Sequence, residues 1–132
     1  MSDAKNELLM SYMKSNVAPI LVDFVDGNNI SNSVVLPANL EISELNGHYD
    51  NVEFVFPEWL NKLEGSTSPI LVIDKIDSIP NNEQTKFVEI LKYRQVSTFE
   101  LPKNTVIIVT AKEINENTIN EEIYSLVAHI KG

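Results

Sequence analysis

The sequence predicts an α/β fold in three layers, with a mostly parallel central sheet of about five strands flanked by helices. Two observations predict this class. The runs 70–73 and 105–110 are mainly aliphatic and lack polar alternation, which is typical of strands buried on both faces of a parallel sheet. Strand patterns also alternate with helical patterns along the chain, which favours parallel strands joined by right-handed crossovers.

The composition fits a single domain over residues 1–132. The chain has 132 residues, 43% of them hydrophobic, which is enough to form a core without disulfides. It contains no cysteine, which excludes a disulfide scaffold, a cysteine nucleophile and a thiolate metal site. The sequence has no secretory signal pattern and no apolar run of the roughly 20 residues that span a bilayer. We therefore expect a cytoplasmic protein with no membrane partner.

The charge balance argues against nucleic acid as a partner. Ten Lys and Arg residues stand against 19 Asp and Glu residues, a formal net charge of −9. Binding to phosphate backbones relies on clustered cations, and Lys86, Lys92 and Arg94 come closest to a cluster here. We therefore expect no direct nucleic-acid binding, and an acidic surface that attracts basic partners.

The first elements follow from periodicity and turn residues. A helix is expected over residues 3–14, because its apolar residues recur at helical spacing. They are Leu8, Leu9, Tyr12 and Met13. Residues 19–25 are expected to form a buried strand, closed by the turn sequence Asp-Gly-Asn-Asn at 26–29.

The middle of the chain has weaker patterns. Expected there are strands at 33–36, 40–42 and 51–56 and a turn at Asn46-Gly47. Pro57 suits the first turn of a short helix over 58–64 that stops at Gly65. The apolar face of this helix includes Trp59, which we interpret as a core residue rather than a stacking platform.

The second half has clearer patterns. The expected elements are a strand at 70–73, a helix at 82–93, a strand at 105–110, a helix at 119–125 and a last strand at 127–130. In such a sheet, ligands bind beyond the carboxyl ends of the strands.

Polar residues follow three of the expected strands. They are Asp23, Asp26 and Gly27 after the first strand, Asp74, Lys75 and Asp77 after the 70–73 strand, and Thr110 and Lys112 after the 105–109 strand. Carboxylates at this edge are candidate ligands for Mg²⁺. The alternative interpretation is that they are solvated residues that end apolar runs. His48 and His129 each lack a second ligand at a metal spacing.

Residues 70–80, Ile-Leu-Val-Ile-Asp-Lys-Ile-Asp-Ser-Ile-Pro, resemble the Walker B segment of AAA+ ATPases. Residues 84–91 resemble the helix that follows it, and 105–111 the strand that carries sensor 1. The order is most similar to the MoxR branch, which also has a Pro-Glu-Trp-Leu helix before Walker B, here residues 57–60. Residues 119–130 resemble the next helix and the last core strand. The resemblance implies a truncated P-loop NTPase-like fold without the C-terminal helical lid.

Within this resemblance, the Walker A loop is degenerate. Such a loop needs glycines, so that backbone N–H groups can surround phosphate, and a lysine for the β- and γ-phosphates. Phe24 and Asn29 stand at the two glycine positions and Ile30 at the lysine position, and only Ser31 fits.

The other catalytic positions are also substituted. Lys75 replaces the Walker B glutamate, Lys112 the polar sensor 1 residue, and Leu126 the arginine finger. Asp74, which helps to hold Mg²⁺ in the family, remains and is the candidate metal ligand. The vestigial nucleotide site implied by the resemblance comprises Gly27, Ser31, Asp74, Lys75, Thr110 and Lys112.

We therefore expect a pseudo-ATPase with no required cofactor, although weak Mg·ATP binding stays open. Such a protein would act as a protein-interaction or regulatory module. Its partner would be an active AAA+ ATPase subunit, a second copy of itself, or a protein from the same operon or phage module.

Two alternatives stay open at this point. One is a residual nucleotide-binding protein with little or no hydrolysis, in which Lys75 and Lys112 replace the missing loop lysine as cations for phosphate. The other is a receiver-type phospho-acceptor domain built on Asp23, Asp26, Asp74 and Lys112, although Phe24-Val25 separates the first two acids.

Overall fold

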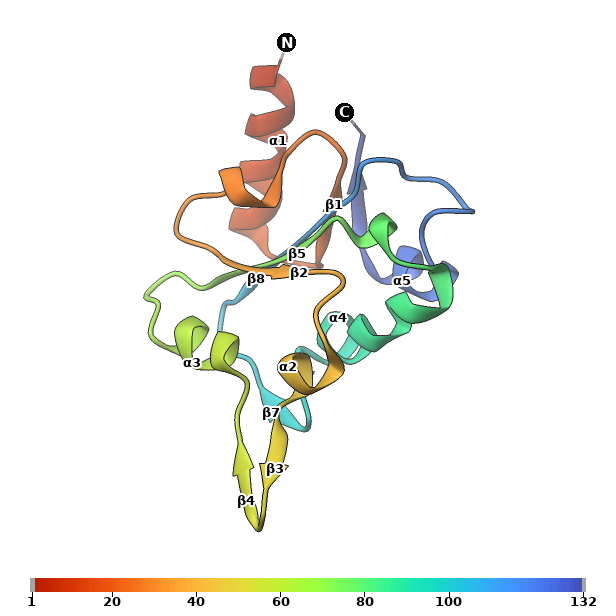
Figure 1. Ribbon diagram of the computed structural model, residues 1–132. Coiled ribbons are helices and arrows are strands. Elements are labelled where there is room, and N and C mark those ends of the chain that lie inside the picture. The colour runs from red at the N-terminus through yellow and green to blue at the C-terminus, as the bar shows by residue number, and fades with distance from the viewer. Residues whose placement is uncertain (1, 132) are drawn as a thin grey trace.

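The computed structural model describes residues 2–131. Its centre is a five-stranded sheet with the order β2-β5-β8-β1-β9, in which every neighbouring pair is parallel. The strands are β1 (Ile20–Val22), β2 (Val34–Pro37), β5 (Ile70–Asp74), β8 (Val106–Thr110) and β9 (Ala128–Ile130). Helices lie on both faces, so the predicted α/β class with a parallel sheet of about five strands is confirmed (Figure 1).

The two apolar runs form the middle of the sheet. β5 pairs with β8 from Ile70 opposite Val106 to Ile73 opposite Val109. Both strands are buried along most of their length because alternate side chains enter hydrophobic clusters on opposite faces. Their carboxyl ends therefore lie side by side at one edge of the sheet, which is the edge where β1 also ends.

One face of the sheet carries most of the helices. These are α2 (Ile42–Asn46), α3 (Glu58–Glu64), α4 (Val88–Tyr93) and α5 (Glu121–Leu126), with the 3₁₀ segments η2 (Ile76–Ser78) and η3 (Asn81–Phe87). Their apolar residues, such as Leu45, Trp59, Phe87 and Ile123, form the larger core with Leu71 and other residues of the sheet. This face supplies the packing that holds β5 and β8 in place.

The opposite face is covered more thinly. α1 (Ser2–Ser15) packs over β1 and β9 (Figure 1). The connection from β1 to β2 runs along the same face and contains only one 3₁₀ turn, η1 (Gly27–Asn29). Parallel strands are usually joined by a helix. Here Phe24, Val25 and Ile30 of the connection cover part of the face instead.

Several boundaries differ from those expected. Residues 40–42 are not a strand: Glu41 caps α2, because its side chain accepts a bond from the helix backbone while Glu44 accepts one from the Glu41 N–H. The expected strand at 51–56 is shorter and forms the antiparallel hairpin of β3 (His48–Asp50) and β4 (Glu53–Val55). The expected helix at 82–93 begins as η3 and becomes α-helical only in α4.

Two further differences concern exposure and a short hairpin. Of the expected stripe on the first helix, Leu9 is buried, whereas Leu8 and Tyr12 are exposed. β6 (Gln95–Val96) and β7 (Phe99–Glu100) form a second antiparallel hairpin that the sequence did not indicate. No helix in residues 2–131 combines the length and the apolar character that a membrane span requires.

The two hairpins share a cluster of aromatic rings outside the core. Phe54 and Phe56 contact Phe99, with ring centroids 5.7 and 4.6 Å apart, and Phe54 also contacts Tyr49 at 5.2 Å. Tyr49 is 72% exposed, and the β3–β4 hairpin projects from the body of the molecule (Figure 1). The cluster joins segments far apart in the sequence and presents apolar surface to solvent.

Candidate functional site

The carboxyl ends of β1, β5 and β8 surround a pocket of about 400 Å³, which we call the strand-end pocket. Residues from the segments that follow these strands line it. They are Asp23, Phe24, Val25, Asp26, Asp74, Lys75, Asp77, Ser78, Thr110, Ala111 and Lys112. The structure thus brings together four of the six residues of the expected vestigial site: Asp74, Lys75, Thr110 and Lys112.

Asp74 lies at the bottom of this pocket and is only 8% exposed. Its Oδ1 accepts a hydrogen bond of 3.0 Å from the Gly27 N–H and one of 2.7 Å from the Thr110 hydroxyl. The Thr110 Oγ1 in turn accepts a bond of 2.9 Å from the Lys75 N–H. The carboxylate therefore joins the ends of all three strands, because its partners come from the loop after β1 and from β8.

Gly27 is the point of closest approach between the β1–β2 connection and β5. A Cβ atom at this position would lie 2.5 Å from Asp74 Oδ1 and 2.8 Å from its Cγ. A residue other than glycine would have to push the connection away from the carboxylate. Gly27 was expected to belong to a vestigial nucleotide site. In the structure, the absence of a side chain at this position allows its backbone N–H to bind the Asp74 carboxylate.

Replacing Gly27 with alanine is expected to lower the free energy of unfolding by about 1–3 kcal/mol, because the added methyl group overpacks a buried contact. Gly65→Ala is a matched control: its Cβ would meet backbone oxygens at ordinary distances of 3.6 and 3.8 Å. Chemical denaturation of both variants measures the difference. Equal stability of G27A and G65A would contradict the contact between Gly27 and Asp74.

Asp77 anchors the loop after β8. Its two carboxylate oxygens accept bonds of 3.1 Å from the Lys112 N–H and 2.9 Å from the Glu113 N–H. The Ser78 hydroxyl donates to the Lys75 carbonyl oxygen at 2.6 Å. The Asp77 side chain thus links the turn after β5 to the backbone of the loop after β8.

The two lysines of the pocket are exposed and emerge from different loops. Lys75 has a φ of 58°, in the left-handed region that residues other than glycine rarely adopt. Its N–H bond to Thr110 accompanies this conformation. The pocket holds four aspartates against these two lysines, Lys75 and Lys112, so its charge is unfavourable for a polyphosphate.

The segment over residues 24–31, which was expected to be a degenerate Walker A loop, makes contacts within the fold. Gly27 is buried and its N–H is directed to Asp74, and Ile30 packs against the smaller core. Ser31 is exposed in a turn and is not among the described residues that line the pocket. Gly27 and Ser31 are thus the two residues of the expected site that the structure leaves outside the strand-end pocket.

Three other residues considered in the sequence, one tryptophan and two histidines, do not line the strand-end pocket. Trp59 is buried in the larger core and its indole N–H donates to the Leu45 carbonyl oxygen at 3.0 Å. His48 lies in β3 and is exposed. His129 lies in β9, with Nδ1 3.1 Å from the Tyr124 hydroxyl. Over residues 2–131, no group of three or more acidic or histidine side chains is arranged to hold a metal ion.

Two of the three cationic residues that come closest to a cluster, Lys86 and Arg94, donate hydrogen bonds to backbone carbonyl oxygens. Lys86 donates to the Leu40 carbonyl oxygen at 2.8 Å. Arg94 donates to the Thr105 carbonyl oxygen and to Asn16 Oδ1. Burial lowers the pKa of the Arg94 guanidinium from its usual value, although arginine keeps its charge over the whole ordinary pH range. These side chains join distant loops of the fold.

Sequence reasoning missed Gln84, the buried polar residue that holds the loop before α5. Its amide donates to the carbonyl oxygens of Ile79 and Thr118 and accepts from the Asn120 N–H. Gln84 is fully buried, and Asn120 caps α5 by accepting from two backbone N–H groups. A glutamine within a segment expected to be helical carries no signal of such a role.

Comparison with known proteins leaves the chain without a family assignment. No protein-family model matches it, and a search of curated proteins returns no significant match. The strand-end pocket contains an aspartate that is already bound by two donors, one of them the Gly27 N–H of the loop after β1, and it carries an excess of negative charge.

Proposed function

We propose that this chain is a degenerate AAA+-like core that no longer turns over ATP and serves as a protein-interaction or regulatory module. The observation that carries the proposal is the bonding of Asp74. The one catalytic acid that the resemblance retains accepts bonds from Gly27 and Thr110, so the loop that would surround phosphate lies against the acid that would hold Mg²⁺.

The strand order bears on the phospho-acceptor alternative. β8 lies between β1 and β5 in the sheet. In chain order the five strands run 2-3-4-1-5 across the sheet, whereas receiver domains have the order 2-1-3-4-5. The strand order therefore disfavours the phospho-acceptor alternative.

The surface of the molecule supports a role in binding proteins. The aromatic cluster of the two hairpins includes Tyr49 and Phe56, which are 72% and 44% exposed. Exposed apolar surface of this kind is typical of interaction sites. A module of this type, docked beside an active AAA+ subunit, would present Leu126 at the place of an arginine finger and slow phosphoryl transfer in the neighbouring site.

A second candidate function is residual nucleotide binding without hydrolysis. The strand-end pocket, of about 400 Å³, carries Lys75 and Lys112, and both side chains are exposed to solvent. Two lysines are suitable partners for phosphate oxygens. The bonded state of Asp74 and the four aspartates of the pocket make this the weaker candidate.

Thermal unfolding with Mg·ATP, Mg·ADP or Mg²⁺ alone separates the two candidates. We expect no change of Tm with any of the three at millimolar concentration. A ligand present at 100 times its Kd would stabilise the protein by about 2.7 kcal/mol, a shift of several degrees. The double variant K75E/K112N, with the Walker B and sensor 1 residues restored, is expected to remain without ATPase activity. A nucleotide-dependent shift would favour the second candidate, residual nucleotide binding, over a module that binds no nucleotide. Turnover by the double variant would overturn the pseudo-ATPase proposal.

A further inference from the structure

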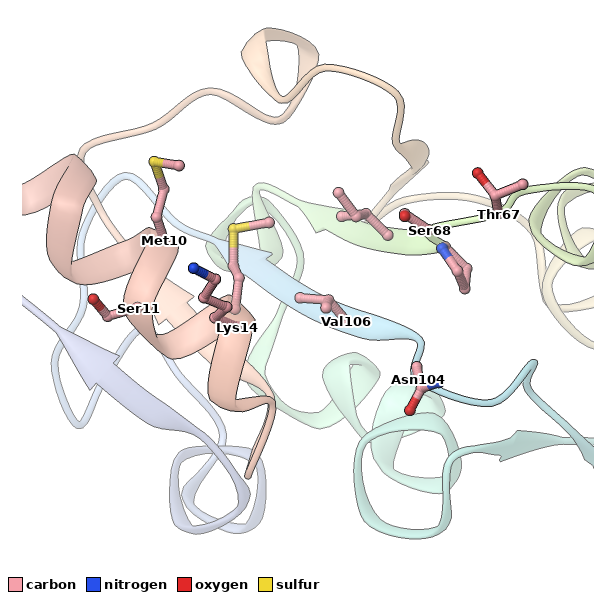
Figure 2. Close-up of a pocket in the computed structure, with 10 residues that line it drawn as sticks. Met10, Ser11, Lys14, Thr67, Ser68, Asn104 and Val106 are labelled. Atoms are coloured by element: carbon pink, nitrogen blue, oxygen red, sulfur yellow. The ribbon is translucent and has the colours of Figure 1, made fainter.

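The face of the sheet that carries α1 is hollowed over β5 and β8. A groove of about 570 Å³ lies there between α1 and the amino ends of these strands. In Figure 2, Met10 and Lys14 extend from α1 on one side of it, Val106 lies on β8 at its floor, and Ser68 lies on the other side. Ile70 completes the apolar floor.

The groove exists because the connection from β1 to β2 contains no α-helix. α1 contacts β1 and β9, and the connection itself packs near the carboxyl ends of the strands. Ile70 and Val106, at the opposite ends of their strands, remain only partly buried on this face. A parallel sheet normally has this surface covered by the crossover helix. The uncovered area therefore lies where a crossover helix normally packs, and its floor is apolar.

The walls of the groove indicate which helix would fit. Met10 is 67% exposed, and the unbranched side chains of Met10 and Met13 can adjust to an incoming surface. Among the described residues that line the groove, Lys14 alone is charged. Lys14 therefore offers a local partner for a carboxylate on the edge of the occupant, although the net charge of −9 opposes an acidic occupant at longer range.

We infer that this groove binds an amphipathic helix of a partner protein, with its apolar face over Ile70 and Val106 and an acidic residue beside Lys14. The inference deepens the proposed function, since it rests on a partner being present and names the surface and the chemistry of the contact. The bound helix would stand where the β1–β2 connection has none. A second copy of the chain is the competing occupant.

The test uses two model helices and the methionine methyl groups as reporters. Both are 14-residue peptides with leucines at positions i, i+3, i+4 and i+7; one has glutamates along the edges of the leucine stripe and the other has lysines. NMR titration of protein labelled at the methionine methyl groups reports on Met10 and Met13. We expect the acidic peptide to shift both signals, and Lys14→Glu to weaken its binding and strengthen that of the basic peptide. For an exposed ion pair, each change amounts to about two- to fivefold.

Lys131→Glu is the matched control, because it changes the net charge equally at an exposed residue that does not line the groove. Methyl signals that stay unchanged at millimolar peptide, or equal effects of K14E and K131E, would overturn the inference. Concentration-dependent self-association that K14E alters would assign the groove to a second copy instead. ATP turnover by K75E/K112N would overturn the proposed function and leave the groove result standing, so the two failures are distinguishable.

Discussion

Replacing Asp74 with alanine is expected to lower the free energy of unfolding by about 3 kcal/mol. The carboxylate is nearly buried and accepts bonds from the Gly27 N–H and the Thr110 hydroxyl. A hydrogen bond to a charged group contributes about 1.5–3 kcal/mol, and its removal leaves both buried donors without an acceptor. Urea denaturation followed by circular dichroism measures the loss.

This result would separate a structural aspartate from a catalytic one. If the carboxylate served only to hold Mg²⁺, it would destabilise the metal-free fold or leave it unaffected, and D74A would be at least as stable as the unmodified protein. Mg²⁺ would then also raise the Tm of the unmodified protein. Asp26→Ala is the matched control, because Asp26 is an exposed acid of the same pocket whose side chain makes no capping bond. We expect D26A to change stability by about 0.5 kcal/mol or less.

Replacing Trp59 with alanine is expected to lower the free energy of unfolding by about 3–5 kcal/mol, the range for deleting a buried aromatic side chain. Trp59 is 6% exposed and packs in the larger core. Its indole N–H also holds the carbonyl oxygen of Leu45, so the loss would loosen the link between α3 and α2. Circular dichroism is the appropriate probe, because the substitution removes the one tryptophan of the chain and with it the tryptophan fluorescence that could follow unfolding.

Trp59→Phe divides this effect into packing and hydrogen bonding. The phenyl ring retains most of the apolar contact but leaves the Leu45 carbonyl oxygen without its donor. We expect a loss of about 1–3 kcal/mol for W59F, smaller than that for W59A. If both variants were as stable as the unmodified protein, Trp59 would be a surface residue available for stacking and not a core residue.

Together, the two substitutions probe the features that tie the candidate site to the fold. Asp74 joins the ends of β1, β5 and β8, and Trp59 fixes the helices on the face that supports β5. A pocket held open for a ligand keeps its polar groups available. Here the central acid is bound by the Gly27 N–H and the Thr110 hydroxyl, which is the physical basis for proposing a binding module in place of an ATPase.

Local pattern was sufficient to predict the central strands and the α3 helix. The aliphatic runs at 70–73 and 105–110 required burial on both faces, which a parallel sheet provides. α3 has the predicted limits, with Pro57 as its N-cap, one position before the first turn, and Gly65 as its C-cap. Proline restricts its own φ, whereas Gly65 has a φ of −78° that any residue can adopt.

Elements stabilised by distant contacts were not predictable in this way. The β6–β7 hairpin turns through Ser97 and Thr98 at positive φ, without the Asn or Gly that marks such turns. Its turn is held by Glu89, which accepts bonds from both N–H groups. α2 (Ile42–Asn46) is capped by Glu41, a residue type that is uncommon as a helix cap.

The sequence by itself determined the α/β class and the parallel strands, because these depend on residue type and short-range periodicity. Only the tertiary structure decided what Asp74 does. Its partners Gly27 and Thr110 are 47 and 36 residues away in the chain, and parallel pairing of the strands brings them within hydrogen-bond distance. The groove beside Lys14 likewise depends on which part of the sheet α1 covers, and side-chain periodicity carries no information about that choice.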